Sequence, residues 1–202
     1  MEIESLRNRD TKGQKDHLSI FPNKRFLVNE EYLQYRGWVP LLDLIEEGST
    51  VLDVGCGVGL SSSILSQRKR CSVIGIDSDK VAISKAKEIK QEYELKSGNI
   101  LNCSYKRLLF IPLFYPYLIL KYKHFDVITI LSVVNNFREL RIFCLDILLK
   151  KFTDKIIIKF ARDYNGEIYD KHFVEEQYNL LLKNFKGSER VEDFVILKSE
   201  KI

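Results

Sequence analysis

The chain has 202 residues, of which 45% are hydrophobic and 30% are charged, and its formal net charge is +4. This length suits one α/β domain and the composition is ordinary for a soluble globular protein, while the basic excess is too small for a nucleic-acid signature. The four cysteines lie far apart in the sequence, without nearby histidines at ligand spacing. We therefore expect no metal site, no disulfide framework and a cytoplasmic location.

Residues 1–47 are expected to form an N-terminal arm and a lid helix, ahead of the main unit at 48–202. The first 25 residues are charged and weakly periodic, and because their start is polar we do not expect them to be a signal peptide. From Glu30 the pattern becomes helical, with Pro40 suited to a first helical turn and Gly48 to a stop. Both parts are expected to fold into one compact domain.

A glycine-rich turn between two strands follows this helix. An apolar strand over Thr50–Val54 leads into Gly55, Gly57 and Gly59, then into a helix, and a second strand over Ser72–Ile76 ends at Asp77. Such a βαβ unit wraps the adenosine half of a cofactor, because glycines let the main chain approach the ligand and the terminal acid can accept ribose hydroxyls.

The next segment is predicted as a helix, a short strand and an apolar run. Ala82, Ala86, Ile89 and Tyr93 share one helical face, and a third strand is predicted over Tyr93–Lys96, ending at Gly98, Asn99 and Ile100. The uncharged run 108–120 is too short to span a bilayer and contains two prolines. It is predicted to pack on the sheet, to wall an apolar acceptor pocket or to form a homodimer face.

Strands and helices continue to alternate to the end of the chain. Strands are predicted over Phe125–Leu131, Lys155–Phe160 and 191–200, with one helix opening at a capping box at Asn136 and another lined by Val174 to Phe185. This alternation predicts an α/β fold with a mostly parallel sheet and helices on both faces.

The spacing of the glycines separates two classes of cofactor. A dinucleotide fingerprint places a third small residue three positions after the second glycine, where the helix receives a pyrophosphate. Leu60 obstructs that approach here, and Asp53 adds negative charge near the turn. The site therefore suits a cofactor without phosphate that carries a cationic amino group.

Four segments in this order resemble the motifs of class I S-adenosylmethionine-dependent methyltransferases. They are VLDVGCGVGLSS, VIGIDSDKVAISKAK, SGNI and FDVITILSVVNNF, spread over about residues 48–160. The resemblance implies a doubly wound, seven-stranded Rossmann-like sheet and S-adenosylmethionine as the cofactor. It also implies a lid helix at Tyr32, Tyr35, Arg36 and Trp38, of which Trp38 is expected in the core rather than in the pocket.

The resemblance also implies a set of cofactor-binding residues. The turn backbone would cradle the methionine part with Asp53 near its amino group, Asp77 would accept the ribose hydroxyls, and Asn99 and Ile100 would contact adenine. The full set is Asp53, Gly55, Cys56, Gly57, Gly59, Asp77, Ser78, Asn99, Ile100 and Ser132. For Asp77 a helix cap is the structural alternative.

Catalytic residues stay open, with Ser132, Asn135 and Tyr164 as candidates beside the methyl group or the acceptor. Arg162 and Asp163 are further candidates for substrate contact. The segment after the fourth strand lacks the N/D-P-P-Y/F/W pattern of amino-methylating enzymes of nucleic acids, which slightly favours a small metabolite over RNA or protein. A catalytically silent methyltransferase-like subunit is the alternative, and a nicotinamide-dependent dehydrogenase is a third possibility.

Overall fold

The computed structural model describes residues 37–107, 124–131, 139–160, 163–164, 167–168 and 171–199. The helices among these residues are α3 (Val39–Leu44), α4 (Leu60–Lys69), α5 (Lys80–Ser97), α7 (Glu139–Lys151) and α8 (Lys171–Asn184). The strands are β1 (Thr50–Val54), β2 (Ser72–Asp77), β3 (Cys103–Arg107), β4 (Val127–Leu131), β5 (Lys155–Lys159), β6 (Asp163–Tyr164), β7 (Glu167–Ile168), β8 (Glu189–Val191) and β9 (Phe194–Lys198).

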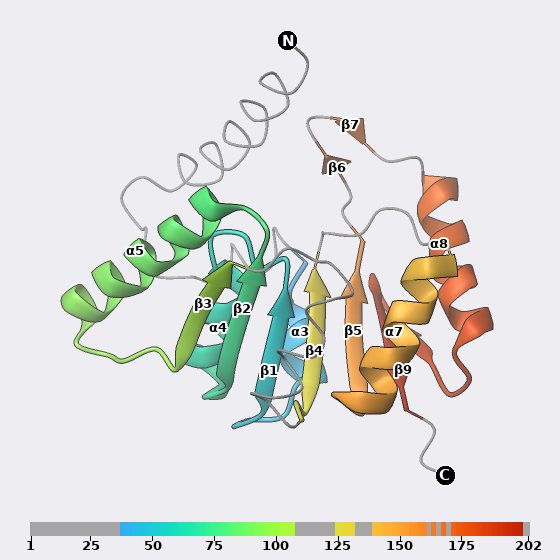
Figure 1. The fold of residues 1–202 in the computed structure, drawn as a ribbon, viewed down its shortest axis with the longest axis horizontal. Helices are drawn as coiled ribbons and strands as arrows, with labels where there is room; N and C mark the ends of the chain where they lie inside the picture. Colours follow the sequence, from blue (N-terminus) through green and yellow to red (C-terminus); the bar gives the residue numbers. More distant parts are fainter. Residues whose placement is uncertain are drawn as a thin grey trace.

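Seven of these strands form one mixed sheet in the order β3-β2-β1-β4-β5-β9-β8. The first five are parallel, so their carboxyl ends meet at one edge (Figure 1). β9 runs antiparallel to β5 and to β8, so the sheet is mixed: four of its six strand pairings are parallel, as predicted, and the two that involve β9 are antiparallel. Only Glu192 and Asp193 separate β8 from β9, and so short a connection can join antiparallel strands only.

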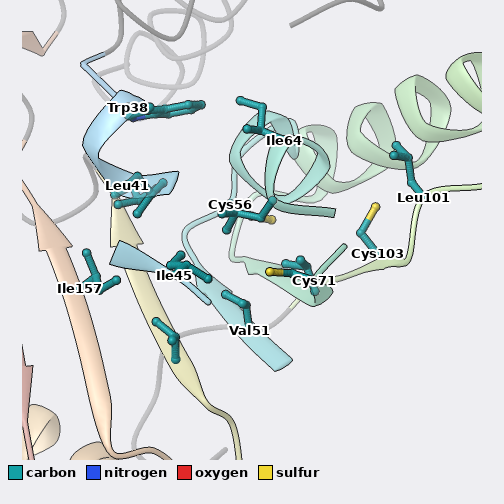
Figure 2. Packing of buried hydrophobic residues seen from close by; sticks show 14 of the residues in the cluster. Trp38, Leu41, Ile45, Val51, Cys56, Ile64, Cys71, Leu101, Cys103 and Ile157 are labelled. Carbon is teal, nitrogen blue, oxygen red and sulfur yellow. The ribbon is translucent and has the colours of Figure 1, made fainter. Parts of the chain in front are cut away.

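Alternate residues of the central strands belong to two different apolar clusters. In β1, Val51 belongs to the cluster packed by α3, α4 and α5, whereas Leu52 belongs to the cluster packed by α7 and α8. Figure 2 shows the first cluster, with Leu41 and Ile45 of the α3 segment close to Ile157 of the sheet. Successive side chains of a strand point to opposite faces, so each helix group covers a different face.

The third strand lies elsewhere than the sequence predicted. Tyr93–Lys96 is the continuation of α5, which ends only at Gly98, a left-handed C-cap with φ of 68°. Tyr93 is buried like Ala82 and Ala86, so the apolar helical face simply extends further along the chain. β3 follows at Cys103–Arg107, an edge strand whose polar composition carries no strong strand pattern.

Several predicted features lie outside the described residues. They are residues 1–36 of the predicted arm and lid segment 1–47, which include the lid residues Tyr32, Tyr35 and Arg36, and the apolar run 108–120. Among the helices that are described, none has both the length and the hydropathy needed to cross a membrane.

Candidate cofactor site

The candidate site lies at the carboxyl edge of the parallel strands. Strand order reverses between β1 and β4, and ligands of open α/β sheets bind at the carboxyl ends of strands beside such a reversal. The glycine turn follows β1 at this edge, and β2 ends next to it (Figure 1). The local sequence pattern therefore places the turn and Asp77 together, as predicted.

The turn is a left-handed backbone held by the neighbouring strand. Gly55, Gly57 and Gly59 have φ of 73°, 53° and 78°, values at which a Cβ is strained. The amides of Gly55 and Cys56 both donate to the Ile76 carbonyl, at 2.8 and 3.0 Å. The path of the turn is thus fixed by the end of β2.

Asp77 is a half-buried carboxylate fixed by two backbone amides. The Gly57 amide donates to Oδ2 at 2.8 Å and the Asp79 amide donates to Oδ1 at 2.9 Å. Asp79 itself caps α5, because its side chain accepts from the Val81 amide at 2.7 Å. The cap of α5 is therefore Asp79 and not Asp77. Each Asp77 oxygen can still accept a hydrogen bond from another donor.

Asp53 lies beneath the turn and is only 1% exposed. Its Oδ2 accepts from the hydroxyls of Ser61 and Ser62, each at 2.6 Å, and its Oδ1 accepts from the Thr129 hydroxyl at 3.0 Å. Burial raises the pKa of this carboxyl, and the three hydroxyls oppose that effect. The carboxylate thus ties β1 to the start of α4 and to β4.

Tyr105 is a residue of this site that the sequence analysis missed. It is 4% exposed, lies opposite Gly75 in the pairing of β3 with β2, and donates its hydroxyl hydrogen to the Gly59 carbonyl at 3.1 Å. Gly75 is the sequence feature that could have indicated this contact, since a glycine inside a strand often marks the close approach of another group.

Asn99 and Ile100 do not join this site, which corrects the predicted adenine contacts. Both precede β3, whose first residue, Cys103, pairs with Val73 at the start of β2. The connection from α5 to β3, which contains both residues, therefore enters the sheet at its amino edge, opposite the glycine turn (Figure 1). Ile100 is 88% exposed there. The error follows from the misplaced third strand.

Arg107, rather than Asn99, ends β3 beside the site. It pairs with Asp77 across the two strands, and its Nε donates to the Ser78 carbonyl at 3.1 Å. Ser78 is exposed at this edge. Cys56 is buried within the turn, and burial raises the pKa of its thiol, so its contribution to a ligand would come from its backbone.

The predicted catalytic positions lie largely outside the described residues. Ser132, Asn135 and Arg162 are among those outside, and of Asp163 and Tyr164 only the backbone is described, in strand β6. Within the described part of the chain, no group of three potential metal ligands comes together.

Residues 45–160 match a family model described as a methyltransferase domain. The chain belongs to this methyltransferase family. The predicted methyltransferase family is thereby confirmed. The chain is also 37% identical over 67 residues to the sterol 24-C-methyltransferase ERG6 of Saccharomyces cerevisiae, a match that covers 33% of the chain and 16% of that protein.

The chain shares its fold with several solved structures. WbdD superposes with a TM-score of 0.57 at 16% identity, over 90% of this chain and 42% of WbdD. The TehB-like SAM-dependent methyltransferase of Corynebacterium glutamicum gives 0.55 at 17% identity, over 96% and 100%. The PH0226 protein of Pyrococcus horikoshii gives 0.55 at 18% identity, over 92% and 99%. The chain thus spans less than half of WbdD and about a sixth of the yeast enzyme, but nearly all of the other two proteins.

Proposed function

We propose that this methyltransferase binds S-adenosylmethionine at the glycine turn and Asp77 and transfers its methyl group to an N or O nucleophile. The observation that carries the proposal is the Asp77 carboxylate, fixed at the end of β2 by the amides of Gly57 and Asp79. Both of its oxygens are held in place and can still accept from the two ribose hydroxyls.

The remaining contacts follow the turn. The backbone of Gly55, Cys56, Gly57 and Gly59 cradles the methionine half, while Ser78 and Ser132 flank the nucleoside and the methyl group. We infer that Asp53 acts as a positioning residue under the turn, since its oxygens are engaged by three hydroxyls. The sheet, with helix groups packed on two faces, is assigned as doubly wound.

The start of α4 favours this cofactor over a dinucleotide. Leu60 is the first residue of α4 and packs against the apolar cluster, where a pyrophosphate site needs a small residue. The Gly57 amide already donates a hydrogen bond to the Asp77 carboxylate, and this amide is one of the donors that a pyrophosphate would require. An added diphosphate would meet a carboxylate of the same sign.

Methyl transfer from a sulfonium depends on alignment of the reactants and exclusion of water more than on acid catalysis. When bound, S-adenosylmethionine supplies a methyl group on a sulfonium that departs as a neutral thioether. The protein positions the acceptor in line behind that methyl, and a base is required only where the acceptor nitrogen or oxygen carries a proton. Ser132, Asn135 and Tyr164 remain the candidates for this side of the site.

The acceptor is proposed to be a small metabolite rather than RNA or protein. The net charge of +4 is modest, and the segment after β4 reads SVVN rather than a nucleic-acid amino-methylation motif. All four cysteines are free thiols, which supports the cytoplasmic location inferred from their spacing. A homodimer through the segment 108–120 stays a proposal, to be tested by the mass in solution.

Calorimetric titration of the full chain with S-adenosylhomocysteine and, separately, with NAD tests the cofactor. We expect a dissociation constant of about 1 μM or below for the first ligand and no binding of the second. Tight binding of NAD alone would overturn the assignment. Binding of neither ligand would favour the silent methyltransferase-like subunit, which the intact turn and Asp77 argue against.

A further inference from the structure

Tyr105 reaches from the edge strand to the underside of the glycine turn. Its partner across the β2–β3 pairing is Gly75, and a Cβ on Gly75 would lie 2.8 Å from the Tyr105 ring and 2.9 Å from the Cys56 sulfur. A Cβ on Gly59 would lie 2.6 Å from the ring and its hydroxyl. The missing side chains of Gly75 and Gly59 thus make the space in which this ring lies.

The Tyr105 hydroxyl is fully engaged at this position. It donates to the Gly59 carbonyl at 3.1 Å, and it accepts from the Cys103 thiol at 3.3 Å and from the Ser63 hydroxyl, 3.0 Å away. One donated and two accepted bonds satisfy a phenolic hydroxyl completely. Burial raises the pKa of this hydroxyl, so it stays a neutral donor at physiological pH.

The bond to Gly59 fixes the junction of the turn and α4. Gly59 is the N-cap of α4 and has no side chain to cap the helix, and its carbonyl already accepts the first helical bond from the Ser63 amide at 3.0 Å. Tyr105 contacts both residues of that first bond. It therefore holds the last residue of the turn at the φ of 78° that the turn requires.

We propose that Tyr105 is a positioning residue for the methionine half of the cofactor, acting through Gly59. The inference rests on the proposed function, because it assumes that the turn cradles this half. The ribose half is held differently, since Asp77 is fixed by the amides of Gly57 and Asp79. Loss of the Tyr105 hydroxyl should accordingly affect one half of the ligand and spare the other.

Two ligands separate these halves. S-adenosylhomocysteine carries both, whereas 5′-methylthioadenosine keeps the adenosine and sulfur and lacks the amino-acid chain. For Tyr105→Phe we expect calorimetry to show affinity for S-adenosylhomocysteine lowered about five- to tenfold and affinity for 5′-methylthioadenosine changed less than about twofold. Ser63→Ala, which removes one partner of the hydroxyl, should shift the same ratio by a smaller factor.

Tyr93→Phe is the matched control. Tyr93 is 7% exposed in the same apolar cluster, on α5, and loses the same atom without touching the turn. It should leave both affinities unchanged. Equal weakening of both ligands by Tyr105→Phe would show a general structural role and overturn the proposal, as would unchanged affinity for both. Failure of the wild-type chain to bind either ligand would instead overturn the proposed function.

Discussion

The two halves of the sheet end in different ways at their shared carboxyl edge. In the half made of β1, β2 and β3, three side chains from three strands, Asp53, Asp77 and Tyr105, bind the glycine turn or the helix start that follows it. In the half that contains β4 and β5, Thr129 is the polar residue of β4, and β5 has an aliphatic centre with a lysine at each end. On the proposed function, the cofactor is held by the sheet itself, whereas the acceptor depends on segments that follow β4 and β5.

The polar residues of the second half serve a different purpose. Lys155 and Lys159 lie at the two ends of β5, and they donate to the carbonyls of Leu44 and Gly37 at 2.9 and 2.7 Å. These carbonyls lie at the two ends of the α3 segment. The two lysines therefore fix the α3 segment to β5, and their hydrogen bonds involve no residue of the glycine turn.

The largest effect is expected from Gly59→Ala. The alanine would have to adopt a φ of 78°, and its Cβ would lie 2.6 Å from Tyr105, so the strain of a left-handed backbone adds to overpacking. We expect the free energy of unfolding to fall by about 4 kcal/mol in denaturant titrations. Gly57→Ala is the control, because its φ is 53° and nothing lies within 4 Å of the added Cβ. It should cost about 1 kcal/mol, and equal losses for both variants would contradict the role given to Tyr105.

Asp53→Ala comes next, because it leaves three buried hydroxyls without their acceptor. We expect a loss of about 3 kcal/mol in the free energy of unfolding. Thr129→Val removes one of the three bonds and should cost about 1 kcal/mol. If Asp53→Ala were no worse than Thr129→Val, the carboxylate would not be the link between β1, α4 and β4 that its contacts indicate.

Lys159→Ala tests the other half of the sheet. Its ammonium is almost fully buried, bonded to the Gly37 carbonyl and 3.7 Å from an Asp193 carboxylate oxygen. We expect a stability loss of about 2 kcal/mol, since a buried partner is left behind, with affinity for S-adenosylhomocysteine changed less than about twofold. Lys155→Ala, at the more exposed end of β5, should cost less. A large loss of affinity in Lys159→Ala would show that β5 also contributes to cofactor binding, which contradicts the proposed division between the two halves of the sheet.

The smallest effect is a pair of opposite pH dependences. Burial raises the pKa of Asp53 in the folded state above its ordinary value of 3.8. At pH values between 3.8 and this raised pKa, the folded state binds a proton that the unfolded state lacks, so stability rises as the pH falls. Hydrogen bonds from the Thr50 amide and hydroxyl lower the pKa of Asp126, so its contribution is lost as the pH falls below 3.8. Unfolding of Asp53→Asn and Asp126→Asn at several pH values should therefore differ from wild type with opposite trends, and a shared trend would contradict this.

The strands that the sequence predicted well are the buried ones. Thr50–Val54 was predicted at its observed bounds, and the strands β2 and β5 differ by one residue at one end. These segments are apolar on both faces, which is a local property of the chain. β3 was missed because an edge strand needs little apolar surface, and the error carried Asn99 and Ile100 to the wrong edge.

The site was predictable as far as it is local. The glycine turn and Asp77 belong to one βαβ unit, and the structure brings them together through the Gly57 amide. Thr129 and Tyr105 come from strands far along the chain, and only the order of strands in the sheet shows that Thr129 reaches Asp53 and that Tyr105 reaches the turn. Their roles therefore depend on tertiary structure, which a strand pattern does not contain.

The most direct test of the central claim is calorimetric titration of Asp77→Ala with S-adenosylhomocysteine, beside wild type and Ser78→Ala. The account predicts at least a tenfold loss of affinity for Asp77→Ala, because two ribose hydroxyls lose their acceptor, and a change below about threefold for Ser78→Ala. Wild-type affinity in Asp77→Ala, with the fold intact by circular dichroism, would contradict the assignment of this edge as the cofactor site.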